Sequence, residues 1–219
     1  MTNLSLIHEY VLYSLTEKGQ IPFMNAEAQI CILAAGLLEL LDAGCIRVDD
    51  DKKIQIATEL IPQLRYLESL YLWIKYSKPM TVEKIAEEYS FSLNGKKLRT
   101  LTNDIGDSLV ALGCAKFEKG GFGKKHYYIP DPDAVDAILD KIRTQILKKT
   151  NPDRYTYMLV YLLEKSRQIK RYFSIEDKDQ IKIRRREIKK SFTGKLQEQM
   201  LFYGDIVVTA VMAVHSDEK

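Results

Sequence analysis

The sequence lacks an apolar run long enough to cross a bilayer. Its longest uninterrupted stretch, Ile30 to Leu38, is about half of the roughly 20 residues that a transmembrane helix needs. The first residues, Met1 to Leu4, hold no basic segment ahead of an apolar one, so we expect no secretory signal peptide. The sequence therefore predicts a soluble protein of the cytoplasm.

Cysteine and histidine are scarce, with three of each among 219 residues. The cysteines are odd in number, have apolar neighbours and form no C-x-x-C pair, which argues against a disulfide framework or a zinc site. They are predicted to be small core residues. The histidines are scattered and have no partner at ligand spacing, so we predict no metal site and no cofactor. The residues concerned are Cys31, Cys45, Cys114, His8, His126 and His215.

Recognisable catalytic patterns are also missing. The glycine-rich segment Gly120 to Gly123 lacks the strand-loop-helix context and the Lys-Ser/Thr pair of a nucleotide-binding loop. Glu87 and Glu88 are adjacent on a predicted helix, so they face different directions and make no acid-base pair. No nucleophile with a matching base is evident. We therefore predict that the protein is not an enzyme.

The composition is that of an ordinary globular protein, with 46% apolar and 29% charged residues, 11 Gly and 6 Pro. Apolar residues recur at helical spacing along most of the chain. We predict a mainly α fold: one compact multi-helix domain over residues 1–219 with two or three small β-hairpins. Residues 25–43 are apolar on nearly every side, which predicts the central helix. The predicted helices are 4–15, 25–43, 61–76, 81–89, 98–112, 134–147, 154–168, 175–190 and 205–214, and the predicted strands are 45–48, 54–56, 115–118 and 126–129.

Basic charge is concentrated in the last two thirds of the chain, although the formal net charge is only +3. Up to Glu59 there are 4 basic and 9 acidic residues, against 29 basic and 21 acidic residues in the remainder. A basic region of this kind favours an anionic partner.

Two groups of basic residues stand out within that region. One group begins a predicted helix, where free N–H groups and the helix dipole attract an anion, and continues in a glycine-tipped hairpin that follows the helix. Its members are Lys96, Lys97, Arg99, Lys119, Lys124 and Lys125, with Phe122 as the apolar tip residue. The other group, from Lys182 to Lys190, is interpreted as the solvated face of a packed helix.

One interpretation of residues 81–129 is a winged helix that binds DNA, with a capped helix, a turn, a recognition helix and a lysine-bearing wing. Against it, the recognition helix would carry Asp104 and Asp107, and negative charge near DNA phosphates lowers affinity. A protein-interaction scaffold without an anionic ligand is a third hypothesis.

Several stretches along the chain also occur in a characteristic order. They are Glu9–Leu15 leading to Lys18-Gly19, Leu37–Leu40 leading to Ala43–Ile46, Leu98-Arg99 leading to Leu109-Val110 and Gly113, Arg154–Leu163, and Ile206–Val211. In order and spacing over most of the chain, this pattern resembles the Golgi phosphoprotein 3 family, peripheral membrane proteins that bind phosphatidylinositol 4-phosphate.

The resemblance implies a mostly helical domain with a membrane-inserting hairpin beside a basic pocket for a phosphoinositide head group. In the family the pocket uses a tryptophan, a basic residue further along the chain, and two basic residues on a later helix. The tryptophan position falls on Met24, the first basic position on Leu33, and the pair on Arg99 and Thr102. Only Arg99 keeps its charge.

The resemblance and the basic residues together predict a non-enzymatic, peripheral membrane protein. Its expected partner is an anionic membrane surface or a phosphoinositide head group, with DNA as the alternative. The expected head-group residues are Arg99, Lys96, Lys97, Thr102, Met24 and Leu33, and the expected membrane hairpin carries Lys119, Phe122, Lys124 and Lys125.

Overall fold

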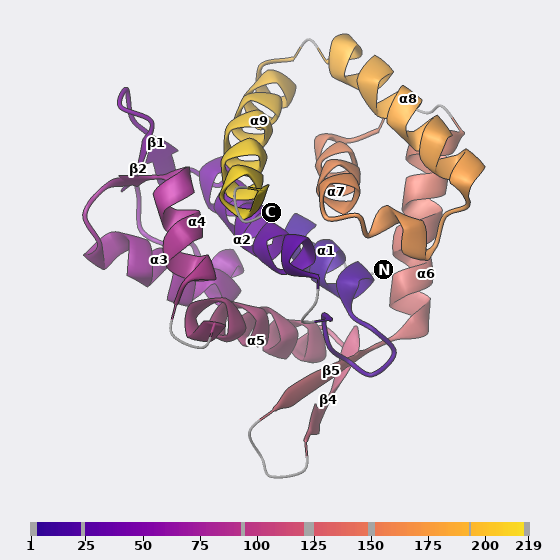
Figure 1. Ribbon diagram of the computed structural model, residues 1–219, viewed down its shortest axis with the longest axis horizontal. Coiled ribbons are helices and arrows are strands. Elements are labelled where there is room, and N and C mark those ends of the chain that lie inside the picture. Colours follow the sequence, from indigo (N-terminus) through magenta and orange to yellow (C-terminus); the bar gives the residue numbers. More distant parts are fainter. Residues whose placement is uncertain are drawn as a thin grey trace.

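The computed structural model describes residues 4–22, 25–92, 95–120, 125–148, 152–192 and 194–216. Within these ranges the chain is mainly helical, as predicted, with short antiparallel strands in two small sheets (Figure 1). The elements in order are α1 (Leu6–Ser14), α2 (Ala26–Asp42), β1 (Ile46–Val48), β2 (Lys53–Ile56), η1 (Pro62–Leu67), α3 (Glu68–Tyr76), β3 (Met80–Thr81), α4 (Val82–Ser90), α5 (Lys96–Ala111), β4 (Ala115–Lys119), β5 (His126–Pro130), α6 (Pro132–Ile142), η3 (Arg143–Leu147), α7 (Arg154–Lys165), η4 (Ile169–Arg171), α8 (Ile175–Ser191) and α9 (Lys195–Ser216).

Helix α2 is the centre of the fold, as its apolar sequence predicts. It packs against α1, α4, α5, α7 and α9, and also against η1 and β1. Its side chains from Ile30 to Leu41 are buried all round the helix. A helix that is apolar on every side needs a partner on every side, so the surrounding helices form a shell around α2.

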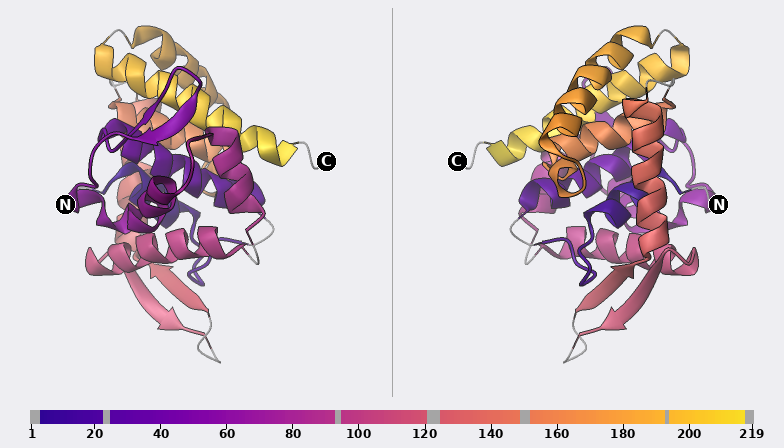
Figure 2. Two further views of the ribbon diagram at one scale, coloured as in Figure 1. Left: turned by 90° about the vertical axis from the view of Figure 1, so that its left-hand side faces the viewer. Right: turned by 90° about the vertical axis from the view of Figure 1, so that its right-hand side faces the viewer.

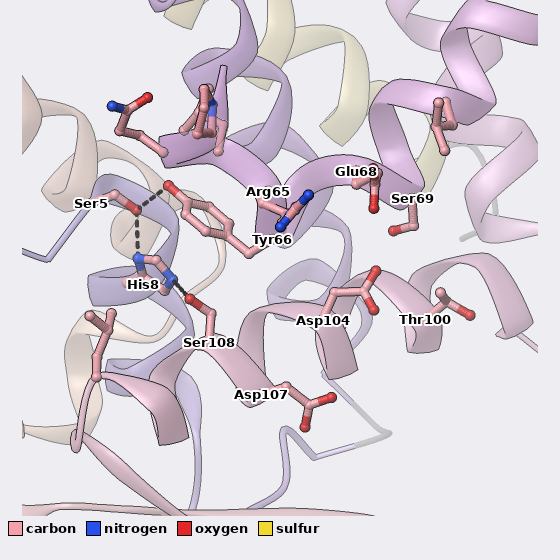
Figure 3. A pocket seen from close by; sticks show the side chains of 15 residues that line it. Ser5, His8, Arg65, Tyr66, Glu68, Ser69, Thr100, Asp104, Asp107 and Ser108 are labelled. Carbon is pink, nitrogen blue, oxygen red and sulfur yellow. Dashed lines mark hydrogen bonds between the residues drawn. The ribbon is translucent and has the colours of Figure 1, made fainter. Parts of the chain in front are cut away.

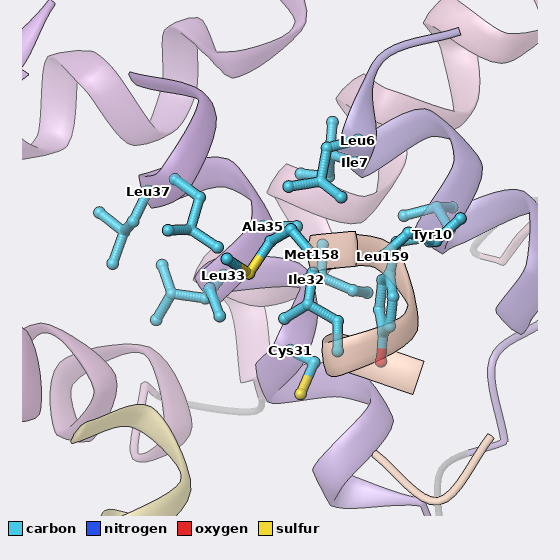
Figure 4. Close-up of a cluster of buried hydrophobic side chains, with 14 of the residues drawn as sticks. Leu6, Ile7, Tyr10, Cys31, Ile32, Leu33, Ala35, Leu37, Met158 and Leu159 are labelled. Carbon is cyan, nitrogen blue, oxygen red and sulfur yellow. The ribbon is translucent and has the colours of Figure 1, made fainter. Parts of the chain in front are cut away.

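The core lies where α1, α2 and α7 meet (Figure 4). Tyr10 from α1, Ile32 from α2 and Leu159 from α7 all lie there and have almost no exposed surface. The Tyr10 hydroxyl donates to the Ala28 carbonyl at 3.0 Å, so the only polar atom of that side chain is satisfied. Within the core, Cys31 is a buried free thiol, and so are Cys45 and Cys114 elsewhere, as predicted.

Local sequence signals set several helix boundaries. The Asn25 side chain accepts a hydrogen bond from the Ala28 N–H at 2.9 Å and begins α2, while Thr81 accepts from the Lys84 N–H and begins α4. Each side chain satisfies one of the free N–H groups of a first turn. Gly44, with φ of +71°, follows the end of α2, because a residue without Cβ tolerates that left-handed conformation.

Some predicted boundaries were wrong. The stretch 61–76 is divided into the 3₁₀ turn η1 and α3, and the stretch 134–147 ends in the π-helical turn η3. Residues 154–168 end as a helix at Lys165, and α9 begins ten residues earlier than predicted, at Lys195 rather than Asp205. The strand Met80–Thr81 pairs with β2 and adds a third strand to the first hairpin.

The hairpin of β4 and β5 packs against α5 through the side chain of Tyr128. The Tyr128 ring lies against Gly106, where an added Cβ would be 2.6 Å from the ring atoms. The Tyr128 hydroxyl is 2.8 Å from Asp107 Oδ1 and 3.1 Å from the Asn103 carbonyl. On the other edge of β5, the Tyr128 N–H donates to the Gly19 carbonyl at 2.9 Å. These contacts fix the direction in which the hairpin leaves the body.

We predict that Gly106→Ala destabilises the protein, although alanine is the better helix former by about 1 kcal/mol. The new methyl group would collide with the Tyr128 ring, and overpacking of this kind costs about 1–3 kcal/mol. The measurement is the free energy of unfolding in urea. Thr100→Ala, an exposed change on the same helix, is the control and is expected to be neutral or stabilising. A Gly106→Ala protein as stable as the control would contradict the contact.

Candidate functional site

Arg99 lies on the side of α5 that the hairpin covers. Arg99, Asn103 and Gly106 are separated by four and three residues, a spacing that puts side chains on one helical face. Asn103 and Gly106 both contact Tyr128, so the hairpin crosses α5 one to two turns after Arg99. Arg99 is therefore on the same face of α5, before the part that the hairpin covers, and its side chain is exposed.

The matching side of the hairpin carries polar and aromatic groups. Cross-strand pairing places Phe117 opposite Tyr128 and Lys119 opposite His126, and side chains two residues apart on a strand share a face. The three rings of Phe117, His126 and Tyr128 are in contact, with centroids 5.1–6.3 Å apart. His126 Nδ1 is 3.3 Å from the Tyr128 hydroxyl. The Tyr128 hydroxyl contacts α5. Further along the hairpin, the same face carries the exposed side chains of His126 and Lys119.

Together these residues form a corner between α5 and the hairpin, which we call the hairpin corner: Lys96 and Arg99 on α5, and Lys119 and His126 on the hairpin. All four side chains are exposed. Figures 1 and 2 show that the hairpin projects from the body with its free end toward the side on which α5 begins. Exposed basic side chains of two separate elements thus flank one junction, an arrangement that favours an anion.

Lys97 was predicted to join this group but lies on another side of α5. Its Nζ is 2.8 Å from Glu88 Oε2 and 4.5 Å from the centre of the Trp73 ring. The ammonium group lowers the pKa of the Glu88 carboxyl through this hydrogen bond. Lys97 stabilises the junction of α3, α4 and α5, and we leave it out of the proposed site.

The other predicted residues are distributed as follows. Leu33 is fully buried in α2, so it cannot touch a head group, and we leave it out of the site. Thr102 is half-buried and its hydroxyl donates to the Leu98 carbonyl at 2.8 Å, a bond within its own helix. Lys125 is exposed beside the hairpin end. Met24, Phe122 and Lys124 lie outside the described residues.

A hollow in the described part of the molecule lies elsewhere. A groove of about 960 Å³ lies between η1, α3 and α5, with the start of α1 at one end (Figure 3). Glu68, Asp104 and Asp107 line it, with Arg65 as the one lysine or arginine side chain among its lining residues. Burial raises the pKa of the Asp104 carboxyl. A groove with this charge disfavours phosphate, so it does not suit the predicted ligand.

A buried polar network closes the inner end of this groove, and the sequence did not reveal it. His8 lies 2.9 Å from Ser5 Oγ and 3.1 Å from Ser108 Oγ, through its two ring nitrogens. Glu39, a carboxylate inside the apolar α2, accepts from the Ile7 N–H at 2.7 Å and from the Tyr66 hydroxyl at 2.8 Å. The network joins α1, α2, η1 and α5, and apart from the Ser5–His8 pair its partners are 27 to 100 residues apart in the chain.

No group of three possible metal ligands occurs among the described residues. Within the same ranges, no helix is both long and apolar enough to span a membrane. What the described surface offers to a ligand is therefore charge: a basic hairpin corner and an acidic groove on neighbouring parts of α5.

We predict that His8 makes the stability of the fold depend on pH. Burial lowers the pKa of His8 from 6.5 to about 4, so between these values the unfolded chain binds a proton that the folded chain excludes. Stability is then lost as the pH falls from 6.5 to 4, by about 3 kcal/mol in all. Burial raises the pKa of Glu9 and of Glu39, which acts in the opposite direction.

The measurement is the free energy of unfolding of wild type and His8→Gln at several pH values. The carboxyl contributions are common to both proteins, so the difference between the two curves isolates His8. We expect that difference to shrink as the pH falls from 6.5 to 4. Parallel curves would show that His8 titrates normally in the folded protein.

Comparison with known protein families gives a match. The family model described as Golgi phosphoprotein 3 matches residues 6–214, from the first residue of α1 to near the end of α9. No curated protein sequence matches the chain. Because the family match covers nearly the whole chain, this protein belongs to the Golgi phosphoprotein 3 family.

Proposed function

We propose that this protein attaches reversibly to membranes by binding anionic, phosphate-bearing lipid head groups in the hairpin corner. The ligand class is a phosphoinositide, of the phosphatidylinositol 4-phosphate type, and the attachment is on the cytosolic face. The observation that carries the proposal is the position of Arg99, on the face of α5 that continues past the Tyr128 contact toward the open side of the hairpin.

The charges of the corner account for the proposed affinity. A hydrogen bond between a charged side chain and a phosphate contributes about 1.5–3 kcal/mol, which Arg99 would supply. Lysines near an anionic membrane surface add about 1 kcal/mol each, which Lys96, Lys119 and Lys125 would supply. Phe117 is 37% exposed on the same face and offers the head-group region an apolar contact. Contributions of this size support binding that salt reverses.

Family membership supports a non-enzymatic role in lipid binding. The family's tryptophan and first basic position fall on Met24 and Leu33, and Leu33 is buried in the core. The proposed site therefore depends more heavily on Arg99 and on the hairpin lysines than the family pattern does. A phosphoinositide is expected to bind weakly unless the surrounding membrane is itself anionic.

Binding of DNA through α5 is disfavoured by two acidic side chains of that helix. Asp104 and Asp107 line the acidic groove beside the corner, where they would repel a phosphate backbone. DNA binding is therefore an outcome that the experiment below must test, and so is a scaffold role without any anionic ligand.

We predict that Arg99→Ala lowers binding to vesicles at least tenfold, because one charge-assisted contact of about 1.5–3 kcal/mol is lost. The measurement is co-sedimentation with neutral vesicles, with vesicles containing phosphatidylserine, and with vesicles containing phosphatidylinositol 4-phosphate as well. Lys97→Ala is the matched control: it removes one charge two residues away, on a side of α5 that faces Trp73 and Glu88.

Binding that requires anionic lipid and is lost in Arg99→Ala but not in Lys97→Ala would support the proposal. Equal binding of wild type and Arg99→Ala would contradict it. So would an absence of vesicle binding together with salt-sensitive binding to duplex DNA.

A further inference from the structure

Helix α8 carries a second group of cations, and the structure divides them into two sets. One set is paired: Arg184 with Glu187 at 2.6 Å, Arg185 with Glu164, and Lys189 with Asp205 at 2.6 Å. The Arg184–Glu187 pair lies within α8, whereas the other two pairs join α8 to α7 and to α9. Part of the basic run from Lys182 to Lys190 is thus engaged in ion pairs within the protein.

The outward-facing set has no such partners. Lys182, Arg186 and Lys190 are exposed and four residues apart, so they form one row along the helix, which we call the α8 outer row. Among the described residues, none of the three makes a side-chain hydrogen bond or ion pair. Buried Ile181 and Ile188 hold the opposite side of α8 against the body.

Two apolar side chains accompany the outer row. Ile183 is 47% exposed and Ile175 is 75% exposed, and both lie on the solvent side of α8. Cations together with exposed aliphatic side chains are typical of a helix that lies on an anionic membrane, where the charges meet the head groups and the apolar groups enter the interface. A nucleic acid backbone offers the two isoleucines no apolar contact.

The α8 outer row lies far from the hairpin corner. In Figure 1 and in both views of Figure 2, α8 is at the opposite end of the molecule from β4 and β5. Its inner side contacts η3, η4 and α7, so its outer side points away from the body. One flat bilayer cannot contact both surfaces at the same time.

We propose that the α8 outer row is a second membrane-binding surface, which docks on a bilayer containing anionic lipid. Because the hairpin corner faces another side, a molecule attached through that corner can hold a second bilayer through α8. Bridging rests on the function proposed above, whereas the contact between α8 and an anionic bilayer does not.

The test measures the clustering of phosphatidylserine-containing vesicles by light scattering, alongside co-sedimentation. The variant is Lys182→Ser, Arg186→Ser and Lys190→Ser in one chain. The control removes the same charge from exposed sites on the β1–β2 hairpin and after α3, with Arg47→Ser, Lys52→Ser and Lys78→Ser. We expect wild type and control to cluster vesicles and the α8 variant to bind single vesicles without clustering them.

A second arm isolates α8 from the hairpin corner. In a background carrying Lys96→Ala and Arg99→Ala, the remaining vesicle binding should fall about 100-fold when the outer row is neutralised, because each of its three basic residues contributes about fivefold near an anionic surface. Unchanged binding in this arm overturns the proposal for α8. If Arg99→Ala leaves vesicle binding unchanged while neutralising the outer row still lowers it, only the function proposed for the hairpin corner is overturned.

Two further outcomes would also overturn the α8 proposal. One is clustering by the α8 variant equal to that of wild type, which would assign bridging to another surface or to self-association. The other is binding of duplex DNA, but not of vesicles, that is lost on neutralising the outer row.

Discussion

The burial of α2 is the constraint on which the rest of this structure depends. A helix that is apolar on all sides is unstable unless every side is covered, and here α1, α4, α5, α7 and α9 supply the cover. Each of these helices must turn an apolar stripe inward, which decides which of its residues face outward. For α5, the inward stripe of Leu101, Ile105 and Leu109 leaves Arg99 on the side where the hairpin packs.

Charged groups inside the shell are held by specific partners, which makes the arrangement of helices more selective. Glu39 would be costly in the centre of an apolar helix without hydrogen bonds, and Ile7 and Tyr66 provide them. The same region places His8 between Ser5 and Ser108. A different packing of α1 and η1 against α2, or of α1 against α5, would leave these polar groups unsatisfied, at a cost of about 1–3 kcal/mol each.

The surface that results carries its charge in separate places. The hairpin corner and the α8 outer row are basic and lie at opposite ends of the molecule, while the groove beside α5 is acidic. A net charge of +3 therefore conceals regions that attract and regions that repel an anionic bilayer. Orientation on a membrane would follow from this distribution rather than from the total charge.

The sequence by itself determined the helical class, the central position of α2, both hairpins and most helix starts, because these depend on local patterns: apolar periodicity, capping side chains and glycines. It also singled out Arg99 and the hairpin lysines as a group, and the order of its segments indicated the family. Only the tertiary structure decided which cations are available. Lys97 is bound to Glu88 and Trp73, half of the α8 run is paired, and Leu33 is buried. The physical reason is that ion pairs, burial and the opening of a corner depend on distances between segments far apart in the chain, which a local pattern does not specify.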